Sequence, residues 1–251
     1  MTSLAIDAAD TLTGKGGTLL SSVVGSRAAE CPRGMVPVAG VTFSCADAYE
    51  VSAAPSCPHV TIGSALDTQA NIDTTECQSQ SAAESLPWVY VTREQARTLC
   101  ARRGARLPTS AEWYQLALGA RDSKGVCNTT GGSVATAGAF PSCVTESKLY
   151  DLIGNVWEWT IDDVIDGVWN GRSLPPTGYV TQVDQSGVAV VTGAVTEASF
   201  YNDYFWSSTH GAFGMMRGGF YGSQDDAGVY ALHAETLPTT AGAAIGFRCV
   251  Q

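Results

Sequence analysis

The chain has 251 residues, of which 45% are hydrophobic, and a formal net charge of −10. This length and composition can bury one sizeable core, so we expect a single globular domain. The negative charge and the 14 scattered Lys and Arg residues argue against a nucleic acid partner, because phosphate binding requires clustered basic side chains. No apolar run approaches the roughly 20 residues that span a bilayer, so we expect no membrane span.

The N-terminal residues 1–30 are rich in Ala, Gly, Ser and Thr without a strong period, which is typical of a flexible arm. No basic segment followed by an apolar one is visible there, so the sequence shows no signal peptide. The globular domain is predicted to span residues 31–251. Within it, residues 35–40 and 49–51 have the pattern of short strands, and residues 55–87 form a long loop closed by cysteines.

Two helices are predicted next along the chain. Thr92 and Gln95 have the spacing of a capping box, and the helix that they begin ends at Gly104. Thr109 and Glu112 have the same spacing at the start of a second helix. Beyond residue 150 only strand and loop signals are found, and no internal repeat is present. Two helices with many short strands and long loops indicate an α+β fold.

The chain contains eight cysteines, and none forms a Cys-x-x-Cys pair. Zinc ribbons and thioredoxin-type redox sites need that close spacing, so both are disfavoured. An even count in a chain of this kind favours disulfides and an oxidising location. The order of the cysteines suggests the local loops Cys57–Cys77 and Cys127–Cys143, although eight cysteines allow 105 pairings.

Residues 217–249 combine a regular frame with unrelated side chains between the frame positions. Frame residues such as Val229, Leu232, Ile245 and Phe247 can fill a core, and the frame glycines can hold turns that need positive φ. The residues between them are predicted to form a display surface for a ligand; they are Phe220, Tyr221, Gly222, Ser223, Asp226, His233, Thr236, Thr240, Gly242 and Ala244. This arrangement predicts binding rather than catalysis, and no catalytic residue is assigned.

Four ordered blocks resemble the signature of the formylglycine-generating enzyme (sulfatase-modifying factor) family: residues 106–113, 154–159, 217–219 and 246–248. The resemblance covers about residues 31–250. It implies a C-type-lectin-like fold with a small mixed sheet, two helices and long loops. The tryptophans of these blocks are expected in the core; they are Trp113, Trp157 and Trp159.

The oxidases of that family bind copper through two cysteines shortly after the Arg-Gly-Gly block, where thiolates suit Cu(I). The matching positions here are Ser223 and Gly228, and no cysteine lies between Cys143 and Cys249. We therefore expect no copper and no oxidase activity. An iron-dependent branch uses a histidine cluster that this chain lacks, and no Gly-x-Ser-x-Gly motif is present. The chain is predicted not to be an enzyme.

The chain also resembles the variable proteins of diversity-generating retroelements, in which copying errors at template adenines diversify a C-terminal region. The residue types at the display positions can all arise from the codon AAC by changes at its adenines, and no Asn follows Asn202. Gln224 and Glu235 do not fit AAC, so each needs another adenine-bearing codon or is not diversified; Glu235 is kept as a ligand-binding candidate. The variable region is predicted at about residues 200–251, and three upstream residues enlarge the surface: Tyr204, Trp206 and His210.

These resemblances imply a non-enzymatic protein that binds a protein or cell-surface ligand outside the cell, on a cell surface or on a phage particle. Aromatic residues in such a surface supply rigid contact area, and small polar residues supply adaptable hydrogen bonds. Two alternatives remain open. The first is an adhesin or phage tail receptor-binding protein of fixed specificity, and the more distant one is an enzyme of the formylglycine-generating type.

The family resemblance implies two further features. Family members bind calcium near the Gly-Asn-x-Trp-Glu block, and the matching groups are the carboxylates of Asp151 and Glu158 with the carbonyls of Gly154 and Val156. Oxygen ligands of this kind suit a hard cation in a structural role. In the alternative, Glu158 is a buried acid with protein partners and Asp151 caps a loop. The resemblance also implies a disulfide between Cys100 and Cys249.

Overall fold

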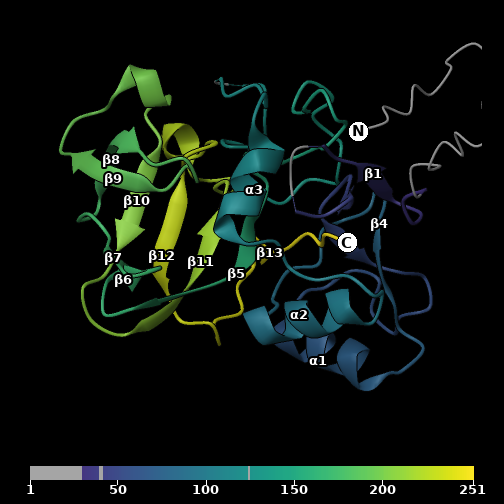
Figure 1. The fold of residues 1–251 in the computed structure, drawn as a ribbon. Coiled ribbons are helices and arrows are strands. Elements are labelled where there is room, and N and C mark those ends of the chain that lie inside the picture. The colour runs from purple at the N-terminus through teal and green to yellow at the C-terminus, as the bar shows by residue number, and fades with distance from the viewer. Residues whose placement is uncertain (1–29, 40–41, 124) are drawn as a thin grey trace, which may run out of the picture. The chain divides into compact units, whose positions relative to one another are not determined.

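The main sheet is organised around its longest strand, β5 (Trp157–Ile165). It contains nine strands, and β13 (Ile245–Gly246) lies parallel to the start of β5. The sheet is mixed, because two of its strand pairs are parallel and the others are antiparallel. The path through the sheet runs β7 (Arg172–Ser173), β6 (Val168–Trp169), β5, β11 (Ala212–Arg217), β12 (Leu232–Thr236), β10 (Tyr204–Ser207), β8 (Gly178–Val183) and β9 (Ala189–Gly193). Figure 1 shows β5, β11, β12, β10 and β8 following one another across the sheet.

The two helices predicted from capping boxes are present in the computed structural model. These are α2 (Arg93–Ala101) and α3 (Ser110–Ala117), and each begins after a threonine that accepts a hydrogen bond from the third helical residue. In both, the Gln95 or Glu112 side chain in turn accepts a hydrogen bond from the threonine N–H. Both helices contact β5, and α3 also packs against β11 (Figure 1).

A third helix, α1 (Ala65–Asp73), lies in the segment that the sequence predicted as a loop. That prediction was wrong because the buried residues of α1 are polar, so the helix has no apolar stripe to detect. Thr68 donates a hydrogen bond to the Val89 carbonyl, and Asn71 exchanges two hydrogen bonds with the backbone of His59. The helix lies beside α2, where Gln95 donates to Gln69.

The structure describes residues 30–39, 42–123 and 125–251, so the predicted arm at 1–30 lies outside the described residues apart from Glu30. Residues Cys31–Gln251 form one unit. The predicted strand at 35–40 is observed at residues 35–37, and the one predicted at 49–51 overlaps an observed strand only at Val51. Two small antiparallel sheets complete the unit. They pair β1 (Met35–Pro37) with β2 (Cys45–Asp47) and β3 (Val51–Ala53) with β4 (Ser79–Ser81). Among the described residues, no helix combines the length and apolar character needed to cross a bilayer.

All eight cysteines lie in the described part of the chain and form four disulfides. The two local pairs suggested by cysteine order, Cys57–Cys77 and Cys127–Cys143, are both present. Cys31 pairs with Cys45, a pairing that the sequence did not indicate. Cys100 in α2 pairs with Cys249 in the C-terminal segment, as the family resemblance implies. The last disulfide connects the helical region directly to the end of the chain.

The frame residues of the C-terminal region are buried, as the sequence predicted. Leu232 and Phe247 have no exposed surface, and Val229 and Ile245 are also buried. The three signature tryptophans lie in the core, although Trp157 keeps a small exposed fraction. This buried frame supports the segments that carry the predicted display residues.

Candidate binding surface

Arg217 fixes the end of β11 against α3. It is fully buried, and its guanidinium donates hydrogen bonds to the Ser110 hydroxyl and to the carbonyls of Ser186 and Gly187. Burial lowers the pKa of Arg217 to about 10, so the side chain stays charged at neutral pH. Because a buried charge is costly unless it is hydrogen bonded, these contacts give the arginine one defined position.

Gly218 and Gly219 then turn the chain from β11 into the display loop, which we define as residues 220–226. Their φ angles are +91° and +89°, a region that side chains disfavour. A Cβ at Gly218 would overlap the Leu152 carbonyl oxygen, and a Cβ at Gly219 would overlap Ala227. The prediction of positive-φ turns is confirmed at Gly218 and Gly219. It was wrong for the frame glycines Gly228 and Gly246, where φ is not positive and a Cβ would instead approach neighbouring atoms too closely.

The display loop forms one wall of a cleft of about 560 Å³, which we call the aromatic cleft. Its other walls come from β5, β8, β10 and β12. The residues that line it are Trp157, Tyr179, Thr196, Trp206, Phe220, Gly222, Ser223, Gln224, Asp225, Asp226 and His233. The sheet register produces part of this wall, because Trp206 lies opposite His233 in the parallel β10–β12 pair.

His233 is part of the packed wall of the cleft. Its ring stacks on Trp206 with centroids 5.5 Å apart and meets the edge of Trp157 at 5.7 Å. Its Nδ1 lies 3.0 Å from the hydroxyl oxygen of Thr236. Burial lowers the pKa of His233 to about 4. The imidazole is therefore neutral at neutral pH.

The acidic side chains of the cleft lie on a short 3-10 turn, η2 (Gln224–Asp226). Gln224 has φ of +56°, and its N–H donates to the Thr129 carbonyl. Partial burial, with a contribution from the neighbouring Asp225, raises the pKa of Asp226. Asp226 gives the cleft an acidic side chain, and no Lys or Arg is among the described residues that line it.

Five of the eleven predicted ligand-binding residues line the aromatic cleft: Phe220, Gly222, Ser223, Asp226 and His233. Tyr221 lies next to the cleft, with its ring 5.1 Å from that of Phe220. The others do not line it: Glu235, Thr236, Thr240, Gly242 and Ala244.

The residues outside the cleft differ in exposure. Glu235 and Thr240 are exposed to solvent, and Thr236 is half-buried beside His233. Gly242 and Ala244 are half-buried, and their carbonyls accept hydrogen bonds from Tyr90 and Trp157. The predicted surface therefore divides into a cleft and a separate set of positions around it.

The cleft also includes residues that sequence reasoning missed. Tyr179 and Thr196 precede the predicted variable region, and Trp157 was expected only in the core. Of the three upstream candidates, Trp206 lines the cleft, Tyr204 packs on the Tyr179 ring at 4.8 Å, and His210 is exposed and does not line the cleft. Alternation along 204–206 could have placed Tyr204 and Trp206 on the face opposite the buried Phe205.

The positions that match the copper cysteines do not fit a copper site. Ser223 accepts a hydrogen bond from the Phe220 N–H through its hydroxyl oxygen. Gly228 has no side chain, and a Cβ there would overlap the carboxylate oxygens of Asp203 and Asp122. A hydroxyl and a hydrogen atom offer no soft ligand for Cu(I). The side chains of Asp203 and Asp122 occupy the space that a cysteine side chain at position 228 would need.

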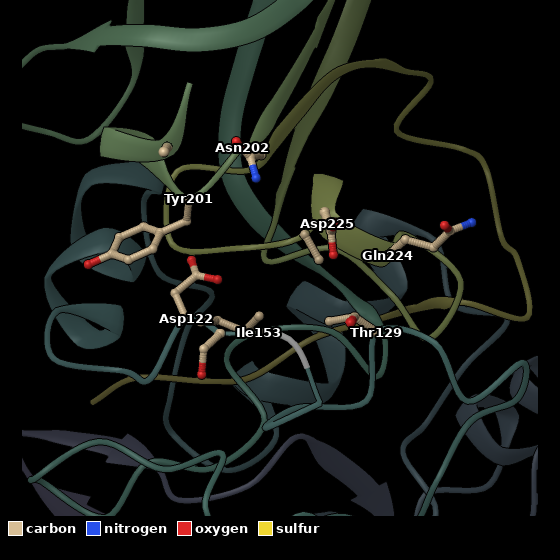
Figure 2. A pocket seen from close by; sticks show the side chains of 10 residues that line it. Asp122, Thr129, Ile153, Tyr201, Asn202, Gln224 and Asp225 are labelled. Atoms are coloured by element: carbon tan, nitrogen blue, oxygen red, sulfur yellow. The ribbon is translucent and has the colours of Figure 1, made fainter. Parts of the chain in front are cut away.

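The two acids beside Gly228 are close to each other and largely desolvated. Asp122 accepts from the Val229 N–H, and Asp203 accepts from the Tyr230 N–H. Burial raises the pKa of Asp122 to about 6, and burial together with the Asp122 charge raises that of Asp203 well above its usual value. Asp122 borders a second pocket of about 250 Å³. Figure 2 shows Asp122 and Tyr201 on one side of this pocket and Gln224 and Asp225 on the other.

The predicted calcium ligands lie in a polar region of the core. Both Glu158 oxygens accept hydrogen bonds from Arg248, and Oε2 also accepts from the Trp113 indole. Asp151 accepts from the Gly138 N–H. The oxygen donors suit a hard cation, but the charge of Glu158 is already balanced by Arg248. Within the described residues, no group of three or more His, Cys, Asp and Glu side chains is arranged to hold a metal. Calcium binding here stays a prediction.

Comparison with known proteins agrees with this architecture. The chain is 35% identical to the inactive C-alpha-formylglycine-generating enzyme 2 of Bos taurus over an alignment of 125 residues, and to that of Mus musculus over 124. Each alignment covers 40% of this chain and 40% of the relative. The chain thus matches well under half the length of these curated relatives.

Among solved structures, the I1 variant of the Major Tropism Determinant has a TM-score of 0.50 and 17% identity, with 88% of this chain and 52% of that chain covered. At this identity the likeness shows the fold, and the predicted α+β, C-type-lectin-like fold is confirmed. The model of the sulfatase-modifying factor enzyme 1-like domain matches residues 15–251. The chain therefore belongs to the sulfatase-modifying factor enzyme 1-like family.

Proposed function

We propose that the protein is a non-enzymatic binding protein that uses the aromatic cleft and the display loop to hold a protein or other cell-surface ligand. The observation that carries this proposal is the convergence of five predicted display residues on one cleft above a buried frame. Rigid aromatic walls with small polar residues are suited to adaptable recognition. An open cleft of this size can accept side chains of a partner.

The absence of catalysis is supported by the chemistry at Ser223 and Gly228. Neither position offers a thiolate, and the carboxylates of Asp122 and Asp203 occupy the space that a side chain at Gly228 would need. The curated relatives are themselves named as inactive members of the formylglycine-generating type. We infer that this chain likewise binds without transforming its ligand.

The finer part of the proposal is that residues 200–251 are diversified by adenine-directed retroelement copying. Substitutions at exposed positions change stability by about ±0.5 kcal/mol or less, so a buried frame can tolerate many surface variants. Gln224 and Asp225 also lie on the display loop and line the aromatic cleft, although neither is among the predicted ligand-binding residues. An adhesin or phage tail protein of fixed specificity would have the same fold without this variation.

We further propose an extracellular, cell-surface or phage-particle location. All eight cysteines are paired, and disulfides persist mainly in oxidising environments. A display surface for a cell-surface ligand also requires such a location.

Population sequencing of the gene, followed by binding assays, tests the proposal. Substitutions should concentrate at the display positions while Val229, Leu232, Ile245 and Phe247 stay unchanged, and a template repeat differing at adenines should lie near a reverse transcriptase gene. Two alleles that differ only at display positions should bind different cells and melt at the same temperature. Evenly spread substitutions would favour the fixed adhesin, and alleles that bind no cell surface would refute the binding role.

A further inference from the structure

The charge of the aromatic cleft sets which ligands it can accept. Its described lining contains Asp226 and no basic residue, in a chain with a net charge of −10. No ion pair joins Asp226 to a Lys or Arg among the described residues. An anionic ligand would be repelled by this wall, whereas a positive group would be attracted to it.

The aromatic rings of the cleft add a second attraction for a positive group. Trp206 is half-buried and stacks on His233, Trp157 meets both rings edge-on, and Phe220 forms part of the opposite wall. The faces of such rings carry negative charge density and attract guanidinium and ammonium groups. His233 does not oppose this attraction, because burial keeps its imidazole neutral at neutral pH.

We propose that the aromatic cleft binds an organic cation, the guanidinium or ammonium group of a side chain presented by the partner, with Asp226 as its counter-ion and Trp206 as its aromatic face. This inference rests on the proposed binding function and names the ligand chemistry of the same surface. A guanidinium can hydrogen bond to a carboxylate and stack on a ring at the same time. A neutral sugar could stack on the rings but would gain nothing from the charge of Asp226.

Titration of the intact, disulfide-bonded chain with small probes tests this proposal. The probes are the N-acetyl methylamides of arginine, lysine and citrulline, together with methyl glucoside, followed by the indole N–H signals in NMR spectra. The arginine and lysine probes should bind more tightly than citrulline, which has the shape of arginine without its charge. Comparison of the two cations identifies which of them the cleft prefers. Binding should weaken as the salt concentration rises.

Two matched variants separate a local effect from a general charge effect. Asp226→Asn and Glu146→Gln each replace an acid by its amide and change the net charge equally, but Glu146 is exposed, outside the cleft and outside the predicted variable region. Asp226→Asn should weaken arginine binding roughly fivefold or more, as expected for the loss of about 1 kcal/mol, and Glu146→Gln should leave it unchanged. Trp206→Leu should weaken binding of both cations.

Three outcomes would overturn the proposal: equal binding of citrulline and arginine, tighter binding of methyl glucoside, or equal effects of Asp226→Asn and Glu146→Gln. The melting temperature of each variant checks that the fold is intact. If alleles still recognise cells while the cationic probes fail to bind, the cation inference is wrong and the binding function stands. If neither the cells nor the probes are bound, both proposals fail.

Discussion

His233 links the architecture of the cleft to a measurable titration. Its pKa is lowered by burial to about 4, compared with about 6.5 in an unfolded chain. The unfolded state therefore binds more protons than the folded state between these values. The contribution of the neutral imidazole to stability is complete above pH 6.5 and is lost as the pH falls toward 4.

The variant His233→Phe keeps an aromatic ring against Trp206 but removes the titration. Relative to this variant, the wild type should lose up to about 3 kcal/mol of unfolding free energy between pH 7 and pH 4. Urea denaturation of both proteins across this range measures the difference. A difference that does not change with pH would show that His233 has an ordinary pKa in the fold.

Asp122 should give the opposite dependence on pH. Its pKa is raised to about 6 by burial, whereas an unfolded aspartate titrates near 3.9. The folded state holds this proton more tightly than the unfolded state does. The resulting contribution to the free energy of unfolding is complete below pH 3.9 and is lost as the pH rises through about 6. Asp203 lies beside it with its pKa raised as well, and Arg217 contributes a distant positive charge.

The variant Asp122→Asn keeps an acceptor for the Val229 N–H and removes the charge. Its stability relative to wild type should rise by up to about 2 kcal/mol between pH 4 and pH 7. The histidine and aspartate effects oppose each other in the wild type, so denaturation of each variant against the same wild-type series is needed to separate them. A constant difference for Asp122→Asn would contradict a raised pKa.

At the residue scale, the sequence predicted which side chains support the surface better than which ones line it. Burial of Val229, Leu232 and Phe247 follows from apolar character, and the turns at Gly218 and Gly219 follow from the properties of glycine. Tyr179 and Thr196 could not be found in this way. Their place in the cleft depends on strand order, which a local pattern does not specify.

At the scale of elements, capping motifs predicted a helix correctly where a periodic pattern of apolar residues followed them. The helices α2 and α3 begin at the predicted capping boxes, each with an apolar face against the core. Helix α1 also has an N-cap, in which Ser64 accepts from the Asp67 N–H. It was missed because its inward positions are Thr68 and Asn71, whose burial depends on hydrogen bonds to distant backbone atoms.

The capping box of α3 provides a test at this scale. Thr109→Ala removes the acceptor for the Glu112 N–H and should cost about 1 kcal/mol of unfolding free energy. Thr98→Ala is the matched control, because Thr98 is on α2 and its hydroxyl only donates to the Glu94 carbonyl within that helix. The control should change stability by about 0.5 kcal/mol or less. Equal effects of the two variants in thermal denaturation would show that the cap contributes nothing specific.

At the scale of the whole molecule, the four sequence blocks that resemble the family signature predicted the fold. The order of the strands in the sheet then determines which side chains line the cleft. The strand order places β10 and β12 side by side although their paired residues are 27 positions apart in the chain. This pairing brings Trp206 to His233 and turns two separate sequence segments into one wall. Local sequence reasoning supplied the display loop, whereas the opposite wall required the three-dimensional register.

The buried frame and the surface positions around it should respond differently to substitution. Tyr221, Asp226 and Thr240 are not buried, so their simultaneous replacement by Ala should change the melting temperature little and weaken cell binding at least about tenfold, a loss of roughly 1.4 kcal/mol. His233 is left unchanged, because its ring packs against both Trp206 and Trp157 and its loss would disturb the wall. Phe247→Ala should instead cost about 3–5 kcal/mol, because the ring has no exposed surface. Because Phe247 lies in the frame and not on the cleft lining, protein that remains folded should still bind.

Calorimetry and a cell-binding assay on both variants measure the two effects. Unfolding of the triple variant, or unchanged binding by it, would show that these positions do not form a surface separate from the scaffold.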